Sequence, residues 1–308
     1  VMVTLPPGWA PWFAARDEVA AIPASKPLLK KPPIVLLVTI DSLRADTLGA
    51  KHDAKLPNLA AFRDASLRFR QARAPGSQTI TTLTEMFMGK YYSQQYWSVP
   101  SHSSNLWPFA DESPRFPGLL AEAGIPTFNA GSTSWLINDL GILRGFTEDQ
   151  YVKPVGTHFT LSELIMPLLF ERLGRVGEGP LFAYVHLMDA HHTARPLGAK
   201  LEDRERYMLN LQTIDGHIGA LVAEVERLGL ADRCYIIVSS DHGEAFGEHG
   251  TFKHNVSVYD ELLRVPLMIK GPKVKPRAVN AAVSLMDVGP TVLDIFGVAT
   301  PGPMMGES

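Results

Sequence analysis

Continuous apolar runs constrain the fold of this 308-residue chain more than any other feature. The first, PIVLLVTI, spans residues 33–40, and similar runs cover 181–188, 234–240 and 264–270, with a shorter one at 125–131. A strand that is apolar at every position, and not only at alternate ones, is typical of a sheet that is buried on both faces. The chain therefore predicts a sheet with a covering layer on each side.

Helical patterns fall between these runs. Strands that alternate with helices indicate a parallel or mostly parallel sheet. We predict an α/β fold with a mostly parallel central sheet flanked by helices on both faces. The predicted helices span residues 57–65, 79–89, 116–124, 161–173, about 202–228 and 290–297.

The two ends of the chain differ from this regular pattern. Residues 1–32 are rich in Pro and Ala and predict an N-terminal lead-in or linker. Residues 33–308 are predicted to form one domain, which the motifs below make the catalytic domain. The chain stops at Gly-Glu-Ser without a closing element, which is typical of a truncated C-terminus.

Composition excludes several classes of protein. The net charge is -3, and no basic stripe is present, so we expect no nucleic-acid partner. The single cysteine, Cys234, excludes an internal disulfide framework and a cysteine-based metal cluster. No apolar run approaches the length needed to cross a bilayer.

Ionisable residues follow the ends of the apolar runs, where open α/β sheets bind their ligands. Asp41 ends the first run, Asp241 and His242 follow the run at 234–240, and His191 follows the run at 181–188. Carboxylates and imidazoles at several strand ends are the ligands of a divalent metal site. Mixed oxygen and nitrogen ligands suit Zn²⁺ or Mn²⁺, whereas an oxygen-dominated shell suits Ca²⁺ or Mg²⁺.

Each of these residues has a simpler interpretation. Asp41 could cap a helix, and His186, inside its strand, could equally be a hydrogen-bonded core histidine. His192 is expected to be solvated or to lie outside the ligand shell. Asp241 and His242 are harder to explain without function, because two ionisable groups after a very apolar strand are costly unless they have a partner.

A cluster of hydroxyls precedes the helix predicted at 79–89, in the segment GSQTITTLTEMFMG. Thr79 would begin that helix, where the positive end of the dipole favours an anion and helps a hydroxyl to ionise. A metal at the same place would lower the hydroxyl pKa further. The alternative is that Thr79 or Ser77 merely caps the helix, and the spacing does not separate the two.

These motifs resemble the sulfatase-like branch of the alkaline phosphatase superfamily over roughly residues 33–305. The stretches that carry the resemblance are VLLVTIDSLRADTLG, PNLAAFRDASLRF, the Thr79 helix ending in MGKYY, AYVHLMDAHH, IIVSSDHGEAFGEHGTFKHN and YDELLRVPLMIKGP, in that order. The resemblance implies the α/β fold of that superfamily. It also implies a metal-assisted, in-line displacement at phosphorus or sulfur by a side chain on the first turn of a helix.

The departures from the family pattern refine this hypothesis. Formylglycine sulfatases carry Cys or Ser, then Pro and Arg, where this chain has Thr79, Thr81 and Leu83. Threonine cannot become formylglycine. Where such sulfatases usually show paired Asp, this chain has Asp41 and Ser42. The pattern is more similar to the phosphoethanolamine and phosphoglycerol transferases of bacterial envelopes, which use a Thr nucleophile.

The resemblance assigns site residues. Asp41, Thr79, Asp241 and His242 would bind one divalent metal, expected to be Zn²⁺ or Mn²⁺, with Ca²⁺ or Mg²⁺ as the alternative. Thr79 would attack the ester and form a covalent phospho-enzyme.

The resemblance also places residues around the transferred group. His191 and His254 match positions that contact the phosphoryl or leaving group, and Lys253 matches a basic position of sulfatases. Glu244 would orient His242.

The expected function is therefore that of a metal-dependent phospho-transferase or phosphoesterase acting on a phosphodiester or phospholipid-type substrate. Two alternatives stay open: a sulfuric ester hydrolase without formylglycine, and a catalytically silent binding or assembly domain. The expected partner is a small-molecule or lipid-head-group phosphoester, and a membrane tether could lie outside this chain. The resemblance alone implies an extracytoplasmic location, in the periplasm or at the outer face of the inner membrane. The oligomeric state is left open.

Overall fold

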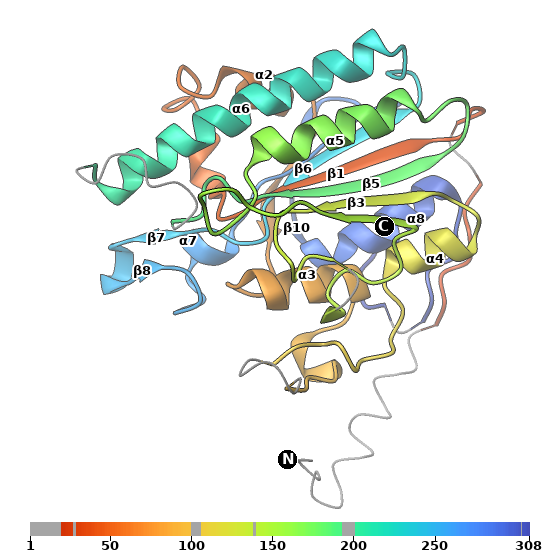
Figure 1. The fold of residues 1–308 in the computed structure, drawn as a ribbon, viewed down its shortest axis with the longest axis horizontal. Helices are drawn as coiled ribbons and strands as arrows, with labels where there is room; N and C mark the ends of the chain where they lie inside the picture. Colours follow the sequence, from red (N-terminus) through yellow and green to blue (C-terminus); the bar gives the residue numbers. More distant parts are fainter. Residues whose placement is uncertain (1–19, 27–28, 100–105, 138–139, 193–200, 303) are drawn as a thin grey trace, which may run out of the picture.

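A computed structural model of the chain shows a central sheet between two layers of helices (Figure 1). The predicted lead-in falls largely on residues 1–19, which lie outside the described part of the chain. The structure describes residues 20–26, 29–99, 106–137, 140–192, 201–302 and 304–308.

The sheet has eight strands in the order β10-β2-β9-β6-β1-β5-β3-β4. All neighbouring strands pair in parallel except β9, which runs antiparallel to both β2 and β6. The predicted mostly parallel α/β fold is therefore confirmed. The strands are β1 (Ile34–Ile40), β2 (Leu67–Arg73), β3 (Thr127–Gly131), β4 (Glu148–Tyr151), β5 (Leu181–Leu187), β6 (Cys234–Ser239), β9 (Leu267–Lys270) and β10 (Arg277–Ser284).

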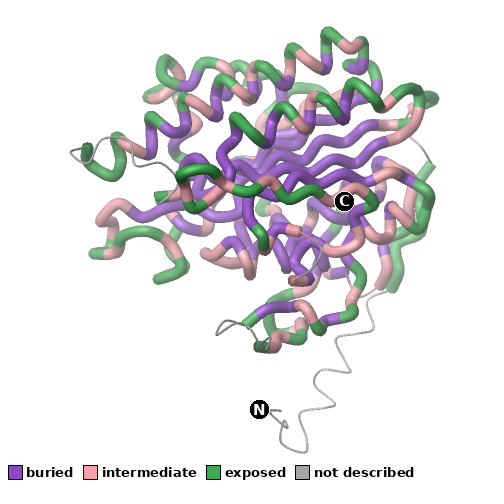
Figure 2. The backbone as a smooth tube through the Cα atoms, in the orientation of Figure 1, coloured by how far each residue is buried: buried purple, intermediate pink, exposed green. Residues whose placement is uncertain are grey.

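Helices cover both faces of the sheet (Figure 1). One face packs against α2 (Pro57–Asp64), α5 (Ser162–Gly174) and α6 (Asp203–Arg227), and the other against α3 (Thr79–Met88), α4 (Phe116–Glu122) and α8 (Val288–Phe296). Alternate residues of β1 enter the two cores, since side chains along a strand point to opposite faces. Every residue of β1, β5 and β6 is buried, as their continuous apolar sequences predict (Figure 2).

The strands that the sequence did not predict lie toward the ends of the sheet. Most positions of β2 and β10 are exposed or only half-buried, and β4 has no buried residue. Their polar sequences therefore lack the apolar pattern of the central strands. The apolar run at 264–270 forms a strand only from Leu267, and in the antiparallel direction.

Shorter elements follow the carboxyl end of β6. A two-stranded hairpin, β7 (Ala245–Phe246) with β8 (Phe252–Lys253), follows β6 and precedes the short helix α7 (Asp260–Leu263). Near the N-terminus, Ile22 exchanges two backbone hydrogen bonds with Thr300. Within the described residues, no helix has the length and apolar character required to span a bilayer.

Candidate active site

Strand register brings two carboxylates to the same edge of the sheet. Thr39 in β1 lies opposite both His186 in β5 and Ser239 in β6. Asp41 lies two residues after Thr39, and Asp241 lies two residues after Ser239. Both carboxylates are fully buried. The structure thus brings together two residues separated by 200 positions, at the carboxyl edge where ligands were expected.

Ser42 connects the two carboxylates. Its backbone N–H donates to Asp241 Oδ1 at 3.2 Å, and its hydroxyl donates to Asp41 Oδ1 at 2.7 Å. Ser42 holds a φ of 60°, in the left-handed region that a non-glycine residue seldom adopts. Ser42 stands where the sulfatase pattern has a second Asp. Here it orients the carboxylates of Asp41 and Asp241.

Thr79 is the first residue of α3, and its hydroxyl faces this acidic pair. Its Oγ1 lies 3.2 Å from Asp41 Oδ2 and 3.2 Å from His242 Nε2. His242 Nε2 in turn lies 3.3 Å from Asp241 Oδ2. The four residues predicted as metal ligands therefore converge in one buried group.

The capping interpretation of the hydroxyl cluster is wrong for this helix. Gln78 occupies the N-cap position, and no side chain in the described part of the chain caps α3. Thr81 and Thr82 donate their hydroxyls to the carbonyls of Gln78 and Gly76. Because no described side chain caps it, the N-terminus of α3 directs its partial positive charge toward the group around Thr79.

The tautomer of His242 follows from its partner. His242 Nδ1 lies 2.8 Å from the carbonyl oxygen of Gly243, which can only accept a hydrogen bond. Nδ1 therefore carries the proton, and in the neutral ring Nε2 offers its lone pair toward Thr79. From the sequence, Glu244 is expected to orient His242. In the structure the Gly243 carbonyl does so instead.

His186 is the functional candidate that sequence reasoning left undecided. Its Nδ1 is hydrogen-bonded to Thr39 Oγ1 at 2.6 Å, which resembles an ordinary core histidine. Its Nε2 has no hydrogen-bond partner in the part of the chain that the structure describes, and it lies 3.5 Å from Asp41 Oδ2 and 3.9 Å from Asp241 Oδ2. The sequence alone could not place His186 beside the two carboxylates. Its position follows from the register of β5 against β1, in which His186 lies opposite Thr39.

The group fits a divalent metal. Asp41, His186 and Asp241 each offer a ligand atom, and these atoms lie within 4.8 Å of one another. The buried Asp241 Oδ2 also lacks a hydrogen-bond partner among the described residues, and buried charges are costly unless they are paired. Burial by itself raises the pKa of Asp41, but the charge of His191 and the contact with His186 outweigh it and hold that pKa well below its ordinary value. The mixed oxygen and nitrogen donors suit Zn²⁺ or Mn²⁺.

A second group of imidazoles lies beside the first. His191, His192 and His254 each offer a ring nitrogen, and the three nitrogens lie within 4.8 Å of one another. The ring of His254 lies 4.4 Å from that of His242, centroid to centroid. The two histidines predicted to contact the transferred group, His191 and His254, are therefore adjacent to the Thr79 group.

Glu244 pairs with this second group. Its Oε1 lies 3.2 Å from His254 Nδ1, and its Oε2 lies 3.8 Å from His192 Nδ1. Burial lowers the pKa of His254, but the hydrogen bond with Glu244 and the nearby carboxylates raise it above its ordinary value. Burial and the charges of His191 and His254 lower the pKa of His192 to about 4.

Lys253 occupies a different place from the other predicted residues. It is exposed in β8 and lines a cavity of about 220 Å³ together with His192 and Glu244. It therefore lies beside the second group and not in the buried group around Thr79.

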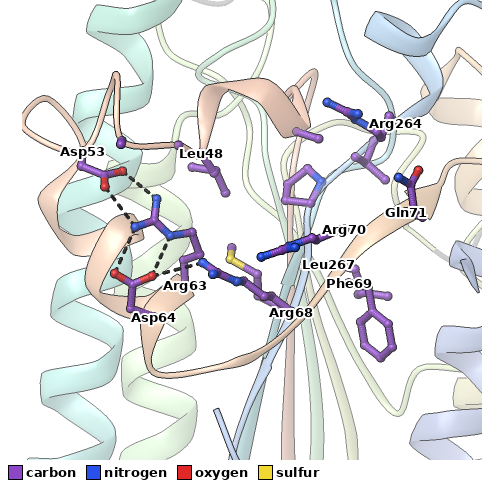
Figure 3. Close-up of a pocket in the computed structure, with 16 residues that line it drawn as sticks. Leu48, Asp53, Arg63, Asp64, Arg68, Phe69, Arg70, Gln71, Arg264 and Leu267 are labelled. Atoms are coloured by element: carbon purple, nitrogen blue, oxygen red, sulfur yellow. Dashed lines mark hydrogen bonds and ion pairs between the residues drawn. The ribbon is translucent and has the colours of Figure 1, made fainter. Parts of the chain in front are cut away.

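A larger cavity, of about 560 Å³, contains none of these residues (Figure 3). Arg68, Arg70 and Arg264 are among its lining residues. Arg63, at its rim in Figure 3, is already held by Asp53 and Asp64. Its lining comes from the segment after β1, the end of α2, β2, and residues 264–268 at the start of β9, so the cavity is separate from the group around Thr79.

Comparison with known proteins decides the family. Residues 33–298 match the sequence profile of the sulfatase family. The chain belongs to the sulfatase family. A curated sulfatase relative, arylsulfatase K from Xenopus laevis, is 36% identical over 106 residues, which cover 34% of this chain and only 20% of that relative.

Solved structures agree on the fold of this sulfatase-family chain. A protein of the alkaline phosphatase superfamily from Vibrio parahaemolyticus superimposes with a TM-score of 0.72 at 19% identity, covering 99% of this chain and 74% of the other. The lipoteichoic acid synthase LtaP from Listeria monocytogenes gives a TM-score of 0.71 at 14% identity, covering 96% and 80%. At these identities the likeness shows the shared fold.

Proposed function

We propose that this sulfatase-family chain is a metal-dependent ester hydrolase whose nucleophile is the hydroxyl of Thr79. The observation that carries the proposal is the position of Thr79 Oγ1, at the N-terminus of α3 and 3.2 Å from both Asp41 Oδ2 and His242 Nε2. A hydroxyl becomes a nucleophile when a base can take its proton and a positive field stabilises the oxyanion.

We propose sulfate esters as the substrates. Curated relatives are named as sulfatases, which supports this alternative better than the phospho-transferase interpretation ranked first from the sequence. Phosphate esters are the second candidate, and Thr79 favours them because threonine cannot be converted to formylglycine. The one cysteine does not replace it, since Cys234 is buried in β6 and burial raises its pKa to about 12.

The residues of the chain divide the steps of the reaction among them. Thr79 Oγ1 forms a bond to sulfur or phosphorus while the bond from that atom to the alcohol oxygen breaks. Without a cation, the hydroxyl proton has two acceptors at 3.2 Å, Asp41 Oδ2 and His242 Nε2. When these atoms serve as ligands, the hydroxyl proton is released to water. His254, whose pKa the contact with Glu244 raises, gives a proton to the departing alcohol oxygen. Water then cleaves the ester on Thr79 and restores the hydroxyl.

The buried group would hold one divalent cation. Asp41, Asp241, His242 and His186 are the proposed ligands, with Thr79 Oγ1 completing the group. When bound, such a cation supplies Lewis-acid stabilisation of the charge that develops on the transferred group.

Replacement of the nucleophile tests the proposal. We expect Thr79→Ala to abolish turnover of nitrophenyl sulfate and of bis-nitrophenyl phosphate, because the variant lacks the proposed attacking oxygen. Thr79→Ser keeps the hydroxyl and should retain measurable turnover of the same ester. Circular dichroism checks that both variants are folded. Turnover in Thr79→Ala equal to that of the unmodified chain contradicts the proposal.

The ratio of the two turnover rates identifies the transferred group. We expect the sulfate ester to react faster; a faster phosphate reaction restores the phospho-transferase or phosphoesterase interpretation. Absence of turnover together with absence of bound metal would support the third interpretation, a silent binding or assembly domain.

The remaining proposals concern the context of the domain. We propose that residues 33–308 form the catalytic unit, that the location is extracytoplasmic, and that the substrate is a small molecule or a lipid head group. The family resemblance supports all three.

A further inference from the structure

We propose that the cavity of about 560 Å³ beside β2 and β9 binds a small organic anion that carries sulfate or phosphate groups. This is the cavity of Figure 3, and the reaction proposed for Thr79 uses none of its lining residues. Small-molecule sites have volumes of about 300–1,000 Å³, so this cavity has room for a ligand larger than a single inorganic ion.

Positive charge exceeds negative charge among the residues that line the cavity. Four arginines and two aspartates contribute to the lining. Both carboxylates already accept from arginines: Arg63 donates to Asp53 at 2.6 Å and to Asp64 at 2.9 Å, and Arg68 donates to the same oxygen of Asp64 at 3.2 Å. Two guanidinium groups thus share one carboxylate, and the charged lining residues together carry an excess of two positive charges.

The other two arginines, Arg70 and Arg264, have only weak partners among the described residues. Arg70 Nη1 donates to the neutral amide oxygen of Asn280 at 3.5 Å. Arg264 Nη1 lies 4.0 Å from Asp260 Oδ2, and the same carboxylate pairs more closely with Arg73, at 3.1 Å. A guanidinium group has five N–H donors, so one weak contact leaves most of them to solvent or to an anionic ligand.

Strand pairing places the arginines around one hollow. Arg68 in β2 lies opposite Met268 in β9, and Arg70 stands two residues further along β2, so all three side chains share one face of the sheet. Met268 belongs to the core that α2, α5 and α6 cover, whereas the two arginines lie beyond it. Arg264 enters from the segment before β9, and Figure 3 shows its side chain across the hollow from Arg68 and Arg70.

The chemistry of the lining selects the class of ligand. The guanidinium fork matches the oxygens of sulfate and phosphate and donates two parallel hydrogen bonds to them. An ester-linked sulfate or phosphate has three free oxygens, so it can accept from more than one arginine, whereas a carboxylate has only two. Leu48, Pro266 and Met268 line the same cavity and offer apolar contacts to the organic part of the ligand. Solvated arginines on an open strand would have no such floor.

Titration calorimetry on the full chain tests the proposal. The probes are sucrose octasulfate and inositol hexakisphosphate, which carry sulfate and phosphate groups respectively on a small ring scaffold, and uncharged sucrose is the blank. We expect the chain to bind at least one of the two polyanions, and the preferred probe identifies the anionic group. Replacing Arg70 and Arg264 together by Gln should weaken that binding about ten-fold or more, because each substitution removes charge-assisted hydrogen bonds.

A matched control separates this cavity from the net charge of the chain. Arg175 and Arg227 are exposed on the opposite ends of this accounting, in α5 and α6 and outside the cavity lining, so replacing both by Gln removes the same charge and should leave the affinity unchanged. Circular dichroism establishes that each variant is folded.

Three results overturn the proposal: neither polyanion binds, the variant of Arg70 and Arg264 binds as tightly as the unmodified chain, or both double variants lose affinity equally. The site is independent of the proposed reaction. Thr79→Ala should lose turnover of nitrophenyl sulfate yet keep the polyanion affinity, whereas the variant of Arg70 and Arg264 should lose affinity yet keep turnover.

Discussion

Ser42 shows how the conformation of one residue organises a site. In the left-handed region it directs its N–H to Asp241 and its hydroxyl to Asp41 at the same time. Backbone strain of this kind persists only where surrounding contacts determine it. Here the surrounding contacts are the two carboxylates, which also lie next to Thr79 and His242.

We predict that Ser42→Ala will destabilise the folded protein by about 1.5–3 kcal/mol, the usual cost of removing a hydrogen bond to a charged group. The substitution removes the 2.7 Å bond to Asp41 Oδ1 and leaves the backbone bond to Asp241 in place. Urea unfolding of the two proteins measures the difference. Ser93, exposed in the 3-10 turn Tyr92–Gln94, provides the control, and Ser93→Ala should leave the unfolding midpoint unchanged. Equal midpoints for Ser42→Ala and the unmodified chain contradict the prediction.

At the scale of elements, α3 has two tasks. Its first residue presents the Thr79 hydroxyl, while its body packs Leu83, Met86 and Phe87 into the core. The same helix buries Glu85, which is 3% exposed and accepts a hydrogen bond from the backbone N–H of Tyr92 at 2.6 Å. Burial raises the pKa of Glu85 to about 7, although that hydrogen bond lowers it.

The raised pKa of Glu85 predicts a pH-dependent stability. The folded protein holds the Glu85 proton up to about pH 7, whereas the unfolded chain loses it near its ordinary pKa of 4.5. The unfolded state therefore binds fewer protons between these values, and the contribution of Glu85 to stability is lost as pH rises through this window. We expect Glu85→Gln to be more stable than the unmodified chain at pH 8, by on the order of 2–3 kcal/mol, and similar to it at pH 4.

Thermal unfolding at several pH values measures this effect. The matched control is Glu122→Gln, at the exposed end of α4, which should follow the pH profile of the unmodified chain. A difference between Glu85→Gln and the unmodified chain that is constant from pH 4 to pH 8 would show that the carboxyl group does not titrate in this range.

At the scale of the whole molecule, the proposed metal site would couple cation binding to folding. Asp41 and Asp241 come from separate strands and meet only in the folded protein, so a cation that needs both binds the folded state alone. The proposed metal should therefore stabilise the molecule as a ligand does.

We predict that a chelator will lower the melting temperature and that Zn²⁺ or Mn²⁺ will restore it. A ligand at 100 times its dissociation constant adds about 2.7 kcal/mol per site. Asp241→Asn removes a ligand of the first group and should reduce the dependence on added metal. Calorimetry with and without chelator provides the measurement. A melting temperature that neither chelator nor metal changes contradicts the proposed centre.

The sequence by itself determined the elements whose pattern is local. The central strands β1, β5 and β6 are apolar at nearly every position, and helices α2 to α6 and α8 show boundaries close to those predicted. The short helix α7 was not predicted. The place of Thr79 at the start of α3 also follows from the local pattern, because the hydroxyls precede an amphipathic run.

Only the tertiary structure decided what depends on contacts between distant segments. The direction of β9, the polar strands β2, β4 and β10, and the position of His186 opposite Thr39 are results of strand pairing. The partner of Glu244 is another, since its carboxylate lies against His254 and not His242. Residue types and their spacing report local periodicity, whereas pairing is set by which surfaces pack together once the chain is folded.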